Sequence, residues 1–468
     1  MTDNSTLTFL GAAQTVTGSK YLIRSGSEQI LLDCGLFQGL KELRLRNWAP
    51  PPFNSSGIDA IVLSHAHMDH TGYLPLVVRL GFRGKIFCTS GTKDLLRVLL
   101  LDSARLQEEE AETANRYGYT KHAPARPLYT VEDAEKTLTY LKAVDYHESF
   151  MVTKSISGFF YRAGHILGSA IVQLQIGSPN PVRFVFSGDL GRWNRPILRD
   201  PELVPEADIL LLESTYGDRI HPPDSDKELA RIINETAQKG GALIIPAFAV
   251  GRIQELTWTI RKLEESNQIP SLPVYVDSPM AISVSDIYCH HPEDHDLDMK
   301  MLMDAEKCPL NPKNNHFVRT PQESKQLNDL PGPMIILSSS GMATGGRVLH
   351  HLKRRLPDSK TTVLLVGYQA AGTRGRLLQD GAKTVKIHGE TVPVNAKIEV
   401  LSGMSAHADK NEIMKWLSGF KKAPRKVYLV HGEESVAEHL AREIHEKLGW
   451  NARVALDGET IPIELALH

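Results

Sequence analysis

The chain contains 468 residues, of which 41% are hydrophobic and 23% are charged. This length exceeds what one hydrophobic core organises, so we expect two domains or one domain with a large insertion. The formal net charge of −2 excludes a protein that holds nucleic acid mainly through a strongly basic surface. No apolar run approaches the length of a membrane span, so no membrane-spanning helix is expected.

The N-terminus and the cysteines indicate the compartment. The first residues contain neither the basic region nor the long apolar region of a secretion signal. The four cysteines, Cys34, Cys88, Cys289 and Cys308, are scattered and show no C-x-x-C spacing. This pattern is typical of reduced thiols rather than of a disulfide frame or a zinc–cysteine site. We therefore expect a cytoplasmic protein with no membrane association.

Apolar strand-like runs alternate with helical segments along the chain, which is the pattern of a layered α/β fold. The first part opens with a meander of short strands, and residues 58–63 are predicted to form a buried strand. Helices are expected over about 92–117 and 130–144. The second of these begins at Thr130 with a sequence that resembles a capping box.

From residue 207 the pattern changes to repeated strand-then-helix units, such as 242–245 followed by 250–265. Repeats of this kind are typical of a parallel sheet. We therefore predict that residues 207–394 form a domain inserted into another domain, whose two parts are 1–206 and 395–468.

The most informative stretch is His65-Ala66-His67-Met68-Asp69-His70, which directly follows the predicted strand. In an extended segment His65 and His67 point the same way, so both imidazoles can reach one metal ion. Asp69 and His70 leave the strand on a bend and point to a second position nearby. Two such groups on one bend indicate two metals that share a bridging group. The alternative is a coincidental histidine patch on a loop.

Three later residues occupy a similar setting: His165, Asp189 and His431 each follow an apolar strand and lie next to glycine. A neighbouring glycine lets the backbone bend and approach a metal closely. Taken singly, each of them could be a strand-end residue whose polar atoms bind the backbone. Taken together, they complete two coordination shells.

The order Asp33, His65-x-His67-x-Asp69-His70, His165, Asp189 resembles the metallo-β-lactamase superfamily, whose fold is an αββα sandwich. Three later segments match the extra motifs of its β-CASP branch, which contains RNA-processing nucleases and DNA-repair nucleases: 211–217 (LLESTYG), 405–409 (SAHAD) and 429–433 (LVHGE). The resemblance covers essentially the whole chain. It implies an α/β architecture, in which a parallel-sheet β-CASP domain is inserted into a metallo-β-lactamase sandwich.

The resemblance also implies the metal ligands. By this resemblance, one zinc ion is held by His65, His67 and His165. The second zinc ion is held by Asp69, His70 and His431. Asp189 and a hydroxide bridge the two ions. The hydroxide is then the nucleophile. Asp33 is expected to orient a ligand histidine, and a simple strand-end hydrogen bond is the alternative.

For proton transfer the resemblance implies His407 as the general acid, with Glu213 holding its tautomer. The alternative for His407 is a residue at the start of a helix beside Asp409. Hydrolysis by such a site is expected to leave 5′-phosphate and 3′-hydroxyl ends.

Two further groups are candidates for contacting substrate phosphates. Ser338, Ser339 and Ser340 form a turn between a strand and a helix, where backbone N–H groups can hold an anion, and a plain turn is the alternative. Arg374 and Arg376 lie on a glycine-rich segment predicted to be a loop that follows RNA, and ordinary surface arginines are the alternative.

The predicted function is a zinc-dependent ribonuclease that acts on single-stranded RNA, either internally or from an end. In the resembling branch a histidine at the last motif accompanies RNA substrates and valine accompanies DNA, so His431 favours RNA. The short stretch after His431 is expected to leave no room for the extra C-terminal domain of one exonuclease group. Alternatives are a DNA-processing nuclease, a catalytically inactive RNA-binding subunit and a small-molecule hydrolase. A homodimer is one assembly that we consider, and the sequence does not decide it.

Overall fold

The computed structural model describes a chain that divides into two compact units. The described residues are 5–118, 124–223, 225–305, 309–310, 314–367, 369–370 and 372–463. The first unit comprises Met1–Arg195, Arg199–Ile220 and His407–His468, and the second comprises Pro196–Leu198 and His221–Ala406.

The first unit contains two seven-stranded sheets. The first sheet has the order β22 (Thr460–Pro462), β1 (Thr6–Phe9), β2 (Tyr21–Ser25), β3 (Glu28–Leu32), β4 (Ala60–Val62), β5 (Lys85–Cys88), β6 (Leu141–Ala143). The second has the order β21 (Ala452–Val454), β20 (Lys426–Val430), β11 (Ile209–Glu213), β10 (Val182–Phe186), β9 (Ala170–Ile176), β8 (Ile156–Arg162), β7 (Ser149–Met151).

The two sheets pack face to face because their strands alternate between two apolar sides. In β10, Phe184 and Phe186 are buried in the core between the sheets, where side chains of β1 and β2 also lie. Val185, one residue out of phase, belongs to a different core on the outer face of the second sheet. This alternation follows from the two-residue period of a strand.

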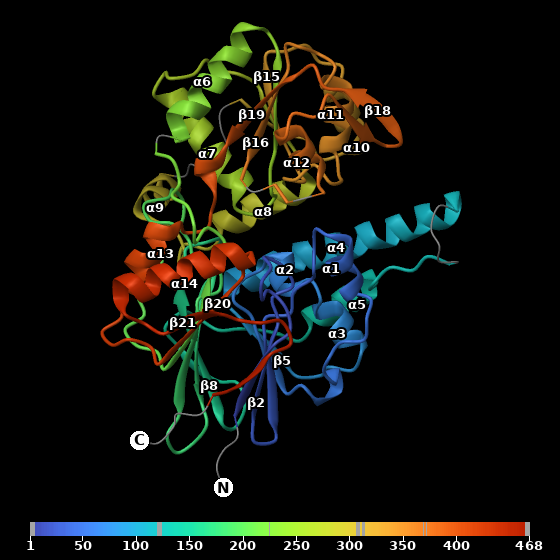
Figure 1. Cartoon of the computed structure of the whole chain (residues 1–468). Coiled ribbons are helices and arrows are strands. Elements are labelled where there is room, and N and C mark those ends of the chain that lie inside the picture. The colour runs from blue at the N-terminus through green and yellow to red at the C-terminus, as the bar shows by residue number, and fades with distance from the viewer. Residues whose placement is uncertain are drawn as a thin grey trace. The chain divides into compact units, whose positions relative to one another are not determined.

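Helices cover both outer faces, which gives four layers (Figure 1). On the first sheet lie α3 (Leu74–Arg79), α4 (Ser90–Tyr117) and α5 (Val131–Leu138). The short helices α1 (Lys41–Arg46) and α2 (Met68–Thr71) and the 3-10 turn η1 (Ser55–Gly57) belong to the connections between its strands. On the second lie α13 (Lys410–Leu417) and α14 (Glu434–Leu448), whose Trp416 and Leu440 pack against Val185. The expected αββα sandwich is confirmed.

The helix boundaries refine the prediction. Thr130 and Asp133 form the predicted capping box at the start of α5. The helix nevertheless ends at Leu138, and the expected extension to 144 is wrong because Leu141–Ala143 form β6 and pair with β5. Asp69 and His70 lie in the short helix α2 rather than on an irregular bend.

The second unit is built on a six-stranded sheet in which every strand pair is parallel. Its order is β14 (Asn315–Phe317), β13 (Val274–Asp277), β15 (Met334–Ser338), β12 (Ala242–Pro246), β16 (Thr362–Val366), β19 (Lys397–Leu401). A hairpin of β17 (Thr384–Ile387) and β18 (Glu390–Pro393) stands apart from this sheet.

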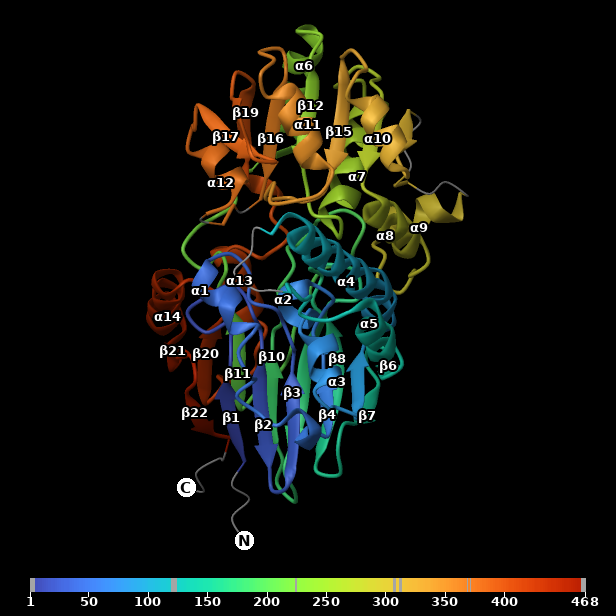
Figure 2. The same ribbon diagram turned by 90° about the vertical axis from the view of Figure 1, so that its right-hand side faces the viewer.

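Helices cover both faces of the parallel sheet (Figure 2). They are α6 (Ser225–Gln238), α7 (Arg252–Glu265), α8 (Pro279–Cys289), α9 (Leu297–Asp304), α10 (Pro321–Leu327), α11 (Val348–Arg355) and α12 (Arg374–Gln379), with the 3-10 turn η2 (Ser402–Met404). Leu243 and Ile245 of β12 join the core beneath α6 and α7, whereas Ile244 joins the core beneath α11. Burial on both faces explains why these strands are continuously apolar.

The boundaries of the inserted unit differ from the expected 207 and 394. Strand β11 pairs with β10 and β20 of the sandwich, so the insertion begins after it, at His221. Strand β19 pairs with β16, so the insertion extends to Ala406. A buried strand looks the same in either sheet, and the apolar pattern therefore cannot assign β11 to the correct one.

Cys34 and Cys88 are free and buried. Cys289 is disulfide-bonded, so the expectation that all four cysteines are reduced is wrong. Among the described residues, no helix is both long enough and apolar enough to cross a membrane.

A buried carboxylate organises one edge of the parallel sheet. Asp277 ends β13 and is fully buried. Its oxygens accept hydrogen bonds from Ser324 Oγ at 2.5 Å, His351 Nε2 at 2.6 Å and Arg347 Nη1 at 2.7 Å. Burial alone would raise the pKa of Asp277, but these three donors hold it below its ordinary value. Asp277 therefore links β13 to α10 and α11.

We expect Asp277→Asn to destabilise the protein by about 3–5 kcal/mol, the range for removing one partner of a buried ion pair. Because the pKa of Asp277 is lower in the folded than in the unfolded chain, its stabilisation is complete above about pH 4 and is lost as the pH falls through the folded value. Thermal unfolding followed by circular dichroism at pH 7 and pH 3 measures both effects. Exposed Asp298, changed to Asn, is the control, and equal melting of both variants at pH 7 would contradict the prediction.

Candidate functional site

The predicted metal ligands meet at one edge of the sandwich, where strands of both sheets end. Asp33 follows β3, His65 and His67 follow β4, His165 follows β8, Asp189 follows β10, Glu213 ends β11 and His431 follows β20. The backbone of Asp33 and His431 is left-handed, with φ of 57° and 50°. Such strained turns at strand ends are typical of functional sites.

Three imidazole nitrogens and one carboxylate oxygen converge in the first cluster. His67 Nδ1 lies 3.1 Å from His65 Nε2 and 3.2 Å from His165 Nε2. Asp189 Oδ2 lies 3.4 Å from His65 Nε2 and 3.6 Å from His165 Nε2. Zinc binds imidazole nitrogen at about 2.0–2.1 Å, so the edges of a tetrahedral site are about 3.3–3.4 Å long. The four atoms could therefore hold one zinc ion.

A second cluster lies on the other side of Asp189. His70 Nε2 lies 3.1 Å from His431 Nε2, and Asp69 Oδ2 lies 3.4 Å from His431 Nε2. Asp189 Oδ1 lies 3.4 Å from His70 Nε2. Asp189 thus presents one oxygen to each cluster, which is the geometry of a bridging ligand.

The histidines of the first cluster are held in the form that binds metals. Burial lowers the pKa of His65 to about 3 and that of His67 to about 4. Burial also lowers the pKa of His165, well below its ordinary value. Their rings are therefore neutral near pH 7, and a neutral imidazole has the lone pair that coordination requires.

The buried carboxylates of Asp189 and Asp33 favour positive charge nearby. Burial opposes ionisation of Asp189, but the surrounding histidines, His431 and His70 foremost, hold its pKa well below the usual range. Burial lowers the pKa of His70, yet the carboxylates of Asp189 and Asp33 raise it well above the ordinary value. Asp189 Oδ1 is buried and has no hydrogen-bond partner among the described residues. A buried acceptor facing ring nitrogens fits a bound cation, since metal coordination would satisfy both.

Neighbouring side chains fix the orientation of the ligand rings. Asp33 Oδ2 lies 2.7 Å from His70 Nδ1, so Nδ1 donates a hydrogen bond to this carboxylate and Nε2 faces the cluster. Two supporting hydroxyls were not predicted from the sequence. Ser64 Oγ lies 2.9 Å from Asp33 Oδ2, and Thr215 Oγ1 lies 3.1 Å from His431 Nδ1. Their positions, one residue before His65 and two after Glu213, are the only sequence signal for them.

Glu213 and His407 form a pair beside the first cluster. The two carboxylate oxygens of Glu213, which is fully buried, lie 3.1 and 3.2 Å from His407 Nδ1. Burial lowers the pKa of His407, but Glu213 and Asp189 raise it to about 9. The N-cap of α13 is Asp409, which forms a capping box with Glu412. His407 is therefore not needed to start that helix.

The predicted phosphate-contacting residues lie in the second unit and have contacts within the protein. Ser338 is buried and donates to the backbone oxygen of Asp277 at 2.9 Å, while Ser339 contacts Ser278. Ser340 Oγ accepts a hydrogen bond from the Thr344 N–H at 3.0 Å.

The two predicted arginines lie at the start of helix α12 rather than on a loop. Arg374 donates to the backbone oxygens of Lys386 at 2.7 Å and Thr344 at 3.1 Å. Arg376 pairs with Asp380 at 2.9 Å. These contacts show a structural use for each residue.

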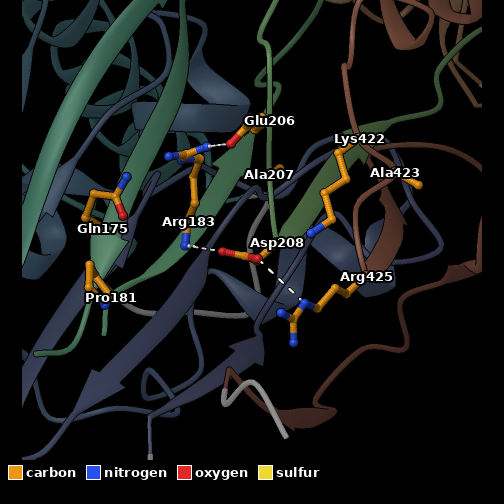
Figure 3. Close-up of a pocket in the computed structure, with 9 residues that line it drawn as sticks. All are labelled: Gln175, Pro181, Arg183, Glu206, Ala207, Asp208, Lys422, Ala423 and Arg425. Atoms are coloured by element: carbon orange, nitrogen blue, oxygen red, sulfur yellow. Dashed lines mark hydrogen bonds and ion pairs between the residues drawn. The ribbon is translucent and has the colours of Figure 1, made fainter. Parts of the chain in front are cut away.

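A separate cavity of about 250 Å³ lies at the opposite ends of β10, β11 and β20 (Figure 3). Asp208 accepts a hydrogen bond from the backbone N–H of Arg183 at 2.9 Å and pairs with the Arg425 side chain at 3.7 Å, while the Arg183 side chain pairs with Glu206. Most residues that line the cavity lie at or just before the starts of β10, β11 and β20, so the cavity is distinct from the ligand clusters at the other edge.

Three families match successive parts of the chain. Residues 28–238 match the beta-lactamase superfamily domain, 253–378 match the Beta-Casp domain, and 391–455 match the Zn-dependent metallo-hydrolase RNA specificity domain. The sandwich and its ligand clusters define a metal-dependent hydrolase.

The similarity extends over whole chains. Ribonuclease TTHA0252 of Thermus thermophilus is 38% identical over 455 residues, which cover 97% of this chain and 99% of the relative. Transcription termination factor FttA of Methanocaldococcus jannaschii is 32% identical over 92% of this chain and 67% of its own length. The chain belongs to the β-CASP branch of the metallo-β-lactamase superfamily. A crystal structure of a protein of unknown function from Enterococcus faecalis V583 shares the fold, with a TM-score of 0.55, 15% identity and coverage of 98% and 100%.

We expect zinc to stabilise chelator-treated protein, because binding to the folded ligands adds to the free energy of unfolding. The gain is about 4 kcal/mol when free zinc exceeds its Kd about a thousandfold. Differential scanning fluorimetry with zinc or magnesium measures it, and His65→Ala should reduce the zinc effect. An identical response of His65→Ala and the unmodified protein would count against the ligand cluster.

Proposed function

We propose that this protein is a zinc-dependent ribonuclease that hydrolyses phosphodiester bonds of single-stranded RNA. The observation that carries the proposal is the position of Asp189, with one oxygen toward each of two ligand clusters, beside the Glu213–His407 pair. The match to an RNA specificity domain and the ribonuclease name of a relative that is 38% identical support RNA as the substrate.

The ligand set that we propose follows the two clusters. His65, His67 and His165 would hold one zinc ion, Asp69, His70 and His431 the other, and Asp189 both. When bound, zinc lowers the pKa of water and offsets negative charge on phosphate oxygens. Asp33, Ser64 and Thr215 keep the ring nitrogens aimed at these positions.

His407 is the proposed proton donor. Glu213 accepts the Nδ1–H of His407, which leaves Nε2 as the ring atom that transfers a proton. Hydroxide attacks phosphorus, the bond from phosphorus to the 3′ oxygen breaks, and His407 protonates that leaving oxygen. The products are a 5′-phosphate and a 3′-hydroxyl end. The buried carboxylate of Glu213 both orients the ring and stabilises its charged form.

We expect His407→Ala to lower the rate of RNA hydrolysis by about 10²–10⁴-fold, the usual contribution of a general acid. Glu213→Gln should lower it by about 10–100-fold, as is typical when a group that orients a functional side chain is lost. A time course with a 5′-labelled unstructured RNA on a denaturing gel measures both. The ladder also distinguishes internal cleavage from removal of nucleotides at an end, and ligation of the products tests for 5′-phosphate.

His290→Ala is the matched control, since this histidine is exposed and belongs to the second unit. Both variants must retain the zinc content of the unmodified protein. Cleavage of a fully paired duplex at the rate of the single strand would contradict the preference for unpaired RNA. Absence of any RNA cleavage by zinc-loaded protein would contradict the proposed function itself.

We expect two zinc ions per chain, measured by inductively coupled plasma mass spectrometry after dialysis. His165→Ala and Asp69→Ala should each lower the content toward one, because each removes a ligand from one cluster only. Asp189→Ala should lower the content further, because both clusters lose an oxygen. A zinc content near one in the unmodified protein would contradict the two-metal proposal.

A further inference from the structure

The α1 arm, defined as residues 38–48, has an unusual concentration of exposed apolar side chains. Leu40 is 46% exposed, Leu45 57% and Trp48 59%, and helix α1 buries none of its residues. Single exposed apolar residues are ordinary, but a cluster with polar neighbours is typical of an interaction surface.

The arm is also basic, although the whole chain has a net charge of −2. It contains Lys41, Arg44 and Arg46 against a single acid, Glu42. Arg46 pairs with Asp457 at 3.0 Å. Among the described residues, neither Lys41 nor Arg44 has an ion-pair partner. The arm therefore carries two cationic side chains without an ion-pair partner among the described residues, in the same segment as the exposed tryptophan.

Both ends of the arm are anchored. Asn47 holds Phe37 through two hydrogen bonds, with Phe37 N–H donating to Asn47 Oδ1 at 2.9 Å and Asn47 Nδ2 donating to Phe37 O at 2.8 Å. The Gln38 N–H donates to Thr17 Oγ1 at 2.8 Å. The exposure of the arm is thus a property of an ordered segment rather than of a loose loop.

The segment leading into the arm contacts the helix that provides two of the proposed ligands. The N–H of Leu36 donates to Met68 O at 2.9 Å, and that of Cys34 donates to His70 O at 2.7 Å. Helix α1 lies beside α2 in both ribbon views (Figures 1 and 2). A polymer bound to the arm would therefore run close to the ligand clusters.

We propose that the α1 arm is a binding surface for single-stranded RNA, on which Trp48 stacks against a base while Lys41 and Arg44 contact phosphates. This combination of an aromatic platform with cations is how proteins bind unpaired strands without sequence preference. The inference rests on the proposed function and adds the residues that hold the substrate outside the metal centre. A second copy of the chain is a less suitable occupant, because a symmetric contact would bring the cations of two arms together.

The experiment measures binding of a fluorescein-labelled 20-nucleotide poly-U RNA by anisotropy, in the His407→Ala background to limit cleavage. Trp48→Ala should weaken binding by about 5- to 150-fold, the equivalent of about 1–3 kcal/mol for one stacked base. Trp48→Phe should restore most of the affinity. The double variant K41Q/R44Q should lower the slope of log K against log salt concentration by about 1.4, since each phosphate contact on a single strand contributes about 0.7.

The control is K421Q/K422Q, which also removes two positive charges, but from an exposed segment at the opposite edge of the sandwich.

A second measurement uses the intrinsic fluorescence of tryptophan. Of the five tryptophans, Trp48 alone is exposed, while Trp193 is half-buried and the other three are buried. Quenching by unlabelled RNA should therefore largely disappear in Trp48→Phe.

RNA binding by the parent protein with equal affinity in all arm variants would overturn the inference and leave the proposed function standing. Absence of RNA binding by the parent would overturn both. A change in mass on Trp48→Ala, measured by sedimentation with RNA affinity unaltered, would identify the arm as a contact between copies and overturn the RNA assignment. Loss of affinity in the arm variants but not in the control would support it.

Discussion

The Asp189 carboxylate is buried between two groups of imidazoles, and the rest of the centre depends on this arrangement. A buried carboxylate is unfavourable unless it is paired, and here each oxygen faces ring nitrogens from a different cluster. The strands of both sheets must end at one edge to bring those rings together. The sandwich therefore acts as a rigid frame, and the hydrogen bonds of His70 to Asp33 and of His431 to Thr215 fix the orientation of these two rings.

Histidine side chains occur in two protonation states in this centre. Burial keeps His65 and His67 neutral, whereas the buried carboxylate of Glu213 keeps His407 charged. Burial lowers the pKa of all three rings, but at His407 the carboxylates of Glu213 and Asp189 outweigh it, whereas at His65 and His67 the nearby carboxylates do not. Environments that move titratable groups in opposite directions are the usual way in which a site separates metal ligands from proton donors.

Short sequence patterns predicted which histidines and aspartates lie together in this centre. A hexapeptide such as His65–His70 has too many ligand types to arise readily by composition, and the positions of His165, Asp189 and His431 at strand ends could be inferred from apolar runs followed by glycine. The sheet that each strand joins could not be inferred, because pairing is a long-range property, and β11 was therefore placed in the wrong domain. Supporting hydroxyls such as Ser64 Oγ were missed because serine is too common for a single occurrence to be informative. The hydroxyls of Ser338 and Ser339 bind the protein itself, and the expectation that backbone N–H groups of this turn hold a phosphate stays a prediction.

Strands β11 and β20 are hydrogen-bonded neighbours, yet the whole parallel-sheet unit lies between them in the chain. During synthesis the ribosome therefore completes β11 long before β20 exists, and the pairing of these two strands is delayed until the insertion has been made. In that interval β11 presents an unpaired apolar edge, which favours misassembly. The inserted unit has its own cores and all the strands of its sheet, so it can fold during the wait. His407 and His431 are made after it, so under the proposed function the nascent chain would lack its proton donor and one metal ligand while translation continues through the insertion.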